Sequence, residues 1–129
     1  MINKLIIDAA KNKIFFMIIK DDNKYKITYE NNKNNYEKLA LLINDFLRSH
    51  NLDFNKISQI YVNGGPGSFA GIRNSLSVVK ALHLTKKTEY YCFSFSDFHD
   101  ENDVKYENIP DLCKKFKVKK NLINPIYLS

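Results

Sequence analysis

The stretch Asn63-Gly64-Gly65-Pro66-Gly67-Ser68-Phe69-Ala70-Gly71-Ile72-Arg73 is the most informative part of this 129-residue sequence. It follows the apolar run 57–62, which is typical of a buried strand, and it precedes a segment with helical periodicity. The glycines and the proline force a loop between these two elements, and the Ser68 hydroxyl can cap the helix by accepting a hydrogen bond from a backbone amide. We therefore predict a strand, a tight turn and a helix that runs from Phe69 to Leu84.

Upstream of this unit, the sequence predicts three antiparallel strands and a long helix. Residues 5–8 and 14–19 are rich in apolar residues, and residues 25–29 alternate apolar and polar side chains as a half-buried strand does. Residues 35–49 carry apolar side chains at steps of three and four, which is the pattern of an amphipathic helix.

Downstream, residues 89–95 are expected to form a fifth strand and residues 109–116 a short last helix, and Pro125 is expected to end the regular structure. This order of elements resembles one half of the ribonuclease-H-like fold that is duplicated in actin-type and sugar-kinase ATPases. The predicted fold class is therefore α/β, with one five-stranded mixed sheet and flanking helices.

Length and composition support one compact domain. A chain of this length fits a single core, and an apolar fraction of 44% argues against intrinsic disorder. We expect a soluble, cytoplasmic protein, because the N-terminal residues do not form a signal peptide and no apolar run approaches the roughly 18 residues of a membrane span.

The net charge of +6 can attract nucleic acid or another acidic partner. Much of this charge lies near the C-terminus, where the lysines lack the interleaved aromatic residues of single-strand binding surfaces. These residues are Lys114, Lys115, Lys117, Lys119 and Lys120. We favour a solvated helix end for this run and keep nucleic-acid binding as the alternative.

The glycine-rich turn has two chemical interpretations. Consecutive amides at a helix start can hold an anion. However, the stretch lacks the Gly-Lys-Ser/Thr of a phosphate-binding loop and the Gly-x-Gly-x-x-Gly of a dinucleotide site. A structural turn is favoured, and a stand-alone nucleotide- or nucleic-acid-binding domain that uses this turn and the basic C-terminal end is the alternative function.

No catalytic or metal-binding group can be identified from spacing. Ser68 does not lie in a Gly-x-Ser-x-Gly elbow, and Cys92, although near His99 in sequence, falls on a predicted buried strand where a thiol packs as a small hydrophobe. The cysteines and histidines show no zinc-ligand spacing. Asp8, at the end of the first strand, is favoured as a turn former.

The sequence from Gly65 to Arg73 resembles the Gly-Pro-Gly-Ser-Phe-Thr-Gly-Leu/Ile-Arg signature of the TsaB (YeaZ) family, with Ala70 in place of the usual threonine. The strand that ends at Asp8 resembles the family's Ile-Asp-Thr-Ser start, although Ala9 and Ala10 replace both hydroxyl residues. The ending, residues 124–128, resembles the family's Pro-Val-Tyr-Leu.

The resemblance implies the N-terminal subdomain of a TsaB-type protein in residues 1–98. Residues 99–129 are then a short C-terminal helix and tail, too short to encode the second ribonuclease-H-like subdomain that family members carry. Asn35 stands where many relatives carry a histidine, so metal binding there is not expected.

The function that the resemblance implies is non-catalytic support of a TsaD-like enzyme in the threonylcarbamoyladenosine modification of tRNA, with a TsaE-like ATPase as a third component and tRNA as an indirect partner. The family pairs through its first two long helices, here predicted at 35–49 and 69–84, and we expect a homodimer through the same helices when the partner is absent. ATP or ADP is expected only at a partner interface, where Asp8 and Arg73 would contact it.

The predicted interface and signature residues lie in the turn and on these two helices, whose apolar positions extend over more than one face. They are Gly65, Pro66, Gly67, Ser68, Phe69, Gly71, Arg73, Leu76, Val79, Leu39 and Ile43. The alternative is that the apolar faces of the two helices pack on the sheet.

Overall fold

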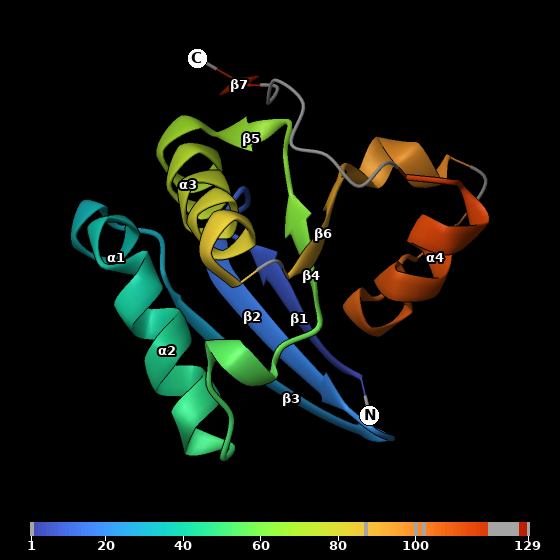
Figure 1. Ribbon diagram of the computed structural model, residues 1–129. Helices are drawn as coiled ribbons and strands as arrows, with labels where there is room; N and C mark the ends of the chain where they lie inside the picture. Colours follow the sequence, from blue (N-terminus) through green and yellow to red (C-terminus); the bar gives the residue numbers. More distant parts are fainter. Residues whose placement is uncertain (1, 87, 100, 102, 119–126, 129) are drawn as a thin grey trace.

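Figure 1 shows the computed structural model, which describes residues 2–86, 88–99, 101, 103–118 and 127–128. The main sheet has five strands in the order β3-β2-β1-β4-β6. Their bounds are β1 Asn3–Asp8, β2 Lys13–Lys20, β3 Asn23–Glu30, β4 Gln59–Asn63 and β6 Glu89–Phe93. The first three strands are antiparallel neighbours, whereas β4 and β6 run parallel to β1. The predicted five-stranded mixed sheet is confirmed.

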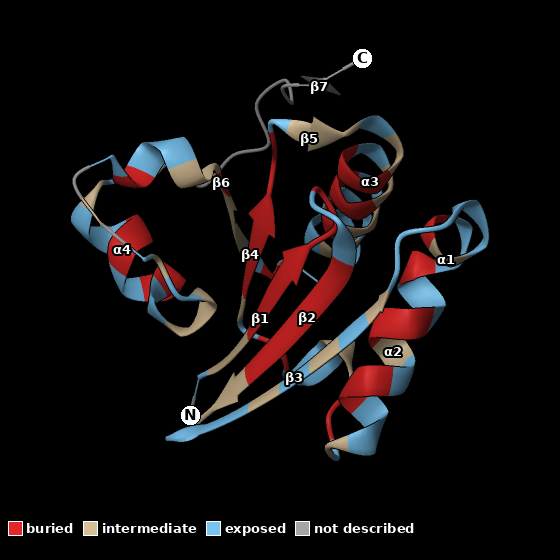
Figure 2. Ribbon diagram, turned by 180° about the vertical axis from the view of Figure 1, so that it is seen from behind, coloured by how far each residue is buried: buried red, intermediate tan, exposed pale blue. Residues whose placement is uncertain are grey.

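The central strands are buried on both faces, and this explains why they read as nearly continuous apolar runs. In β1 the residues from Leu5 to Asp8 are all buried, and β2 is buried from Ile14 to Ile18 (Figure 2). The edge strand β3 alternates exposed and half-buried residues instead. Side chains therefore pack against the sheet from both sides.

One face of the sheet is covered by three helices, which are α1 Lys33–Glu37, α2 Leu39–Ser49 and α3 Phe69–Lys86 (Figure 1). The single helix predicted over 35–49 is wrong in one respect, because Lys38 leaves the helical conformation with φ −109° and ψ 29°. Asn32 caps α1, and the side-chain amide of Asn35 donates to the Glu30 carbonyl at 2.9 Å. These bonds tie α1 to the end of β3, and α2 begins anew.

The other face is covered by the C-terminal segment, on the side of the sheet opposite α1 to α3 (Figure 1). This segment holds the short 3-10 helices η2 Phe95–Phe98 and η3 Tyr106–Asn108 and the helix α4 Ile109–Lys115. Four of its buried side chains, Phe98, Ile109, Leu112 and Cys113, form a cluster with Ile6, Phe15, Met17, Tyr61 and Phe93. The predicted division of the chain into residues 1–98 and 99–129 stays a prediction. The described residues after 98 share a hydrophobic core with those before it.

Several predicted boundaries differ from the structure, and three of them concern β4, β6 and the chain after Pro125. Residue 57 lies before β4, after the 3-10 helix η1 Phe54–Lys56. β6 ends at Phe93 because Ser94 and Asp97 form a capping box that starts η2. Regular structure also continues after Pro125, since β7 Tyr127–Leu128 pairs with β5 Gly67–Ser68. Pro125 itself lies outside the described residues, as do Lys119, Lys120 and residues 124–126 of the predicted ending.

Candidate functional site

The glycine-rich turn is held to the rest of the chain by its own backbone amides. Gly64 N donates to the Phe93 carbonyl at 2.8 Å, and Ser68 N donates to the Ala10 carbonyl at 2.9 Å. Gly65, which has φ 108° and precedes a cis bond to Pro66, donates its N–H to Asn63 Oδ1 at 2.9 Å. Each of these amides thus has an acceptor within the protein, so they do not form an open anion site.

The Ser68 hydroxyl accepts a hydrogen bond from Gly71 N at 3.2 Å, which confirms the predicted helix cap. Two glycines let α3 lie directly on the turn after β1. A Cβ atom at Gly67 would come within 2.3 Å of the Ala10 carbonyl oxygen, and one at Gly71 within 1.7 Å of the Ala9 carbonyl oxygen. The signature therefore encodes a close backbone contact between the start of α3 and the turn after β1.

Asp8 is fully buried at this same junction. One carboxyl oxygen accepts from Ala10 N at 3.0 Å, and the other accepts from the Tyr106 hydroxyl at 2.6 Å. Burial, together with the neighbouring Asp8 carboxylate, raises the pKa of Tyr106 above its ordinary value. The Tyr106 ring also stacks on Phe15 with ring centroids 3.9 Å apart. Tyr106 of the C-terminal segment therefore covers Asp8.

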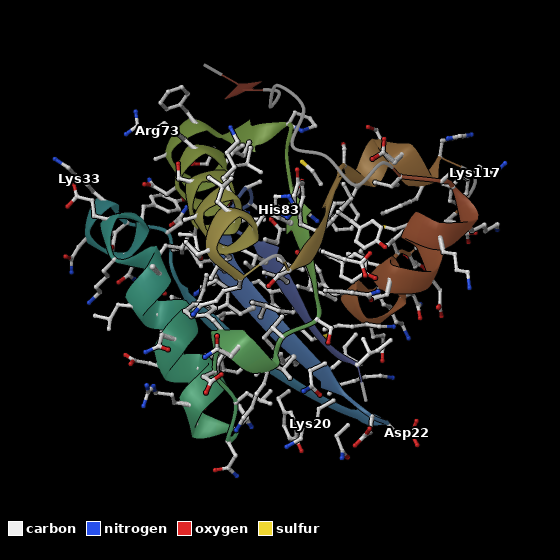
Figure 3. The ribbon with its side chains drawn as sticks, in the orientation of Figure 1. Lys20, Asp22, Lys33, Arg73, His83 and Lys117 are labelled. Atoms are coloured by element: carbon white, nitrogen blue, oxygen red, sulfur yellow. The ribbon has the colours of Figure 1, made fainter. Side chains whose placement is uncertain are left out.

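Arg73 is exposed near the start of α3, where its guanidinium lies 5.6 Å from the Phe69 ring centroid (Figure 3). The two residues predicted to contact a nucleotide thus differ in accessibility, because Asp8 is enclosed and Arg73 faces solvent.

Four predicted interface residues lie in the core between the helices and the sheet. They are Leu39, Ile43, Leu76 and Val79, each at most 4% exposed. For these residues the alternative interpretation, packing on the sheet, is the one that the structure supports. Their burial leaves any direct partner contact to other residues of the same helices.

Large apolar side chains are exposed on these same two helices. Leu41 on α2 is 55% exposed, and Phe69 and Leu84 on α3 are 47% and 78% exposed. We call these three residues the exposed helix face. Sequence analysis named only Phe69 among them. The exposure of Leu41 and Leu84 could have been suspected, because the apolar positions of both helices extend over more than one face.

The surroundings of Ser68, Cys92 and Cys113 do not activate them as nucleophiles. The Ser68 hydroxyl acts as a helix cap. Burial, with a smaller contribution from Asp97, raises the pKa of the Cys92 thiol to about 11 and that of Cys113 to about 12. Thiolates are the reactive form of cysteine, so neither thiol is activated.

Within the described residues, no group of three or more histidine, cysteine, aspartate or glutamate side chains could hold a metal ion. In the same part of the chain, no helix has the length and apolar character needed to cross a bilayer.

A family model described as "TsaD: tRNA N6-adenosine threonylcarbamoyltransferase" matches residues 5–115. The chain belongs to this family. It is 29% identical over 80 residues to the tRNA threonylcarbamoyladenosine biosynthesis protein TsaB of Buchnera aphidicola subsp. Baizongia pistaciae, an alignment that covers 62% of the chain and 36% of that protein. The chain therefore spans about a third of the length of this TsaB.

Solved structures support the same fold. YeaZ from Pseudomonas aeruginosa superposes with a TM-score of 0.67 at 18% identity, over 73% of the chain and 44% of YeaZ. Thermus thermophilus RuvC, in complex with a Holliday junction substrate, superposes with a TM-score of 0.54 at 7% identity, over 98% of the chain and 86% of RuvC. The ribonuclease-H-like fold is confirmed, and the chain is a TsaB/YeaZ-like member of the TsaD family.

Proposed function

We propose that this chain is a non-catalytic scaffold subunit that supports a TsaD-like enzyme in the threonylcarbamoyladenosine modification of tRNA. The observation that carries the proposal is the exposed helix face, which lies on α2 and α3. The first of these helices comes after the first three strands, and the second begins within the family signature. Large apolar side chains that two neighbouring helices expose to solvent are contact points that a partner subunit can bury. The name of the TsaB relative supports the pathway.

The structure of the turn supports a scaffold rather than a catalytic role. Gly67 and Gly71 fix the start of α3 against the turn after β1, so α3 has one position relative to the sheet. α2 packs beside α3 with Leu39 and Ile43 in the shared core. A partner thus meets a rigid pair of helices, which lowers the entropic cost of docking.

The occupant that we propose for the exposed helix face is the helical face of a cytoplasmic TsaD-like subunit. A second copy of this chain would use the same face when that subunit is absent, and a TsaE-like ATPase would join the assembled pair. ATP or ADP held at this interface would meet Arg73, which is exposed at the start of α3.

The test is a quantitative pull-down of the purified chain with the TsaD-like protein from the same source. Leu41→Asp and Leu84→Asp place a charge on the exposed helix face without altering the core. Each should weaken binding by at least about tenfold, because a charge in an apolar interface costs more than about 1.4 kcal/mol. Ile2→Asp is the matched control, since Ile2 is as exposed as Leu41, at 55%, but lies outside the helices.

The modification reaction gives a second readout. Adding the wild-type chain to the TsaD-like enzyme, tRNA and the threonylcarbamoyl donor should raise product formation, and adding Leu41→Asp should not. Equal binding by all the variants would reject the exposed helix face as the interface. Product formation by the chain without the enzyme would reject the non-catalytic role.

A further inference from the structure

A groove lies on the opposite side of the sheet from the exposed helix face. It runs between α4 and the parallel strands β1, β4 and β6, and it encloses about 420 Å³. This volume falls within the range of about 300 to 1,000 Å³ that small-molecule sites occupy. Its lining includes two aromatic side chains, three lysines and one acidic side chain, which are Tyr61, Tyr91, Lys4, Lys114, Lys117 and Asp111.

The aromatic part of the groove is preorganised. The rings of Tyr61 and Tyr91 stack with centroids 4.8 Å apart and planes 8° from parallel. The Tyr61 hydroxyl donates to Gln59 Oε1 at 2.9 Å, which fixes the ring in place. Tyr61 is buried and Tyr91 is half-buried, so Tyr91, held by its stacking on Tyr61, presents the aromatic surface of the groove. Nucleobases stack on exposed aromatic rings of this kind in a sequence-tolerant way.

The lysines supply uncompensated positive charge. Within the described residues, Lys4, Lys114 and Lys117 have no ion-pair partner, whereas the neighbouring Lys115 pairs with Glu101 at 2.7 Å. Asp111 contributes the one negative charge of the lining. Figure 3 shows Lys117 on the α4 side of the molecule. The groove therefore carries a net positive charge beside a flat aromatic surface.

We propose that this groove binds a nucleoside phosphate, either free or as one unit of an RNA strand. The base stacks on Tyr91, whose ring Tyr61 holds in place, and the phosphate is neutralised by Lys114 and Lys117 near the end of α4, with Lys4 from β1. A phosphate bound by lysines gives an affinity that falls with salt, because the contacts release counterions. The site is separate from the exposed helix face, so it stands or falls independently of the scaffold function.

The test is a titration of the ¹⁵N-labelled full chain with adenosine 5′-monophosphate, followed by amide chemical shifts. Shifts should be confined to residues around the groove, including Tyr61, Tyr91 and Lys114. Lys114→Ala should weaken binding by a few-fold, and Lys114→Ala with Lys117→Ala by about tenfold, since each exposed charge pair contributes up to about 1 kcal/mol. Lys115→Ala is the matched control, because it removes the same charge from the adjacent position outside the groove.

Two further measurements test the aromatic half of the site. Tyr91→Leu keeps an apolar side chain but removes the stacking surface, and it should weaken binding by at least about fivefold, since stacking of one base contributes about 1 to 3 kcal/mol. Inorganic phosphate at equal concentration should shift the lysine amides but not those of the tyrosines. If phosphate and the nucleotide give the same shifts, the stacking proposal is overturned.

A ten-nucleotide oligoadenylate distinguishes the two sources of the ligand. Tighter binding of the oligomer at the same residues would assign the groove to an RNA strand, and binding of the mononucleotide alone would assign it to a free nucleotide. Absence of shifts with either probe overturns the proposal. Equal losses in Lys114→Ala and Lys115→Ala also overturn it, because they would show a diffuse charge effect.

Discussion

The hydrogen bond between Tyr106 and Asp8 connects η3 to the end of β1, and Tyr106→Phe tests what it contributes. The substitution removes one hydroxyl and keeps the ring that stacks on Phe15 at 3.9 Å. Because Asp8 is fully buried, it then retains the Ala10 amide as its remaining partner in the described structure. Hydrogen bonds to charged groups contribute about 1.5 to 3 kcal/mol, so we expect the free energy of unfolding to fall by about 2 kcal/mol.

Urea denaturation followed by far-ultraviolet circular dichroism measures this loss. With a slope of about 1.5 kcal/mol per molar urea, the midpoint should move down by about 1.3 M. Tyr25→Phe is the matched control, since the Tyr25 ring stacks on His50 and its hydroxyl has no hydrogen-bond partner in the described part of the chain. A double-mutant cycle with Asp8→Asn should show coupling. Equal midpoints for Tyr106→Phe and Tyr25→Phe, or additive losses in the cycle, would refute the reasoning.

Three further predictions follow from the packing and the pKa shifts. Gly71→Ala should destabilise the fold by about 3 kcal/mol or prevent folding, because the new Cβ lies 1.7 Å from a backbone oxygen. The control is Ser77→Ala on the exposed side of the same helix, which should change stability by less than about 0.5 kcal/mol in the same urea assay. With a pKa of about 11, Cys92 should react with a disulfide reagent at pH 8 about a hundredfold more slowly than an ordinary thiol, and a rate equal to that of free cysteine would contradict its burial. The pKa values of Cys113 and Tyr61 are also raised in the folded state, so the unfolded chain loses these protons at a lower pH than the folded chain does. The free energy of unfolding should therefore decline as pH rises above about 9, and a thermal midpoint that stays constant from pH 8 to 11 would contradict this.

Local patterns predicted most of the elements. The alternation of apolar and polar residues in 25–29 and the apolar runs of β1 and β2 follow from the period of a strand, and the Ser68 cap follows from hydrogen bonding between near neighbours. The break at Lys38 was missed because it depends on the anchoring of α1 to Glu30, an interaction outside the helix itself. The end of β6 was placed too late because the apolar character of Phe95 outweighed the capping signal at Ser94.

The candidate sites depended more strongly on tertiary contacts. No tyrosine lies near Lys114 and Lys117 in sequence after Tyr106, and the tyrosines that line the groove with them come from β4 and β6. The partner for Asp8 is likewise 98 residues away along the chain. Periodicity also could not say which apolar residues of α2 and α3 face the sheet and which face solvent.

The sequence by itself determined the order of the strands and helices, the turn at Gly65 to Gly71 and the family of the chain, because these rest on residue types that interact within a few positions of each other. Tertiary structure decided that Leu76 and Val79 are core residues, that Leu41 and Leu84 are exposed, and that Tyr106 covers Asp8. The physical reason is that a residue is buried only when another part of the chain packs on it. That surface is supplied by segments whose approach no local pattern encodes.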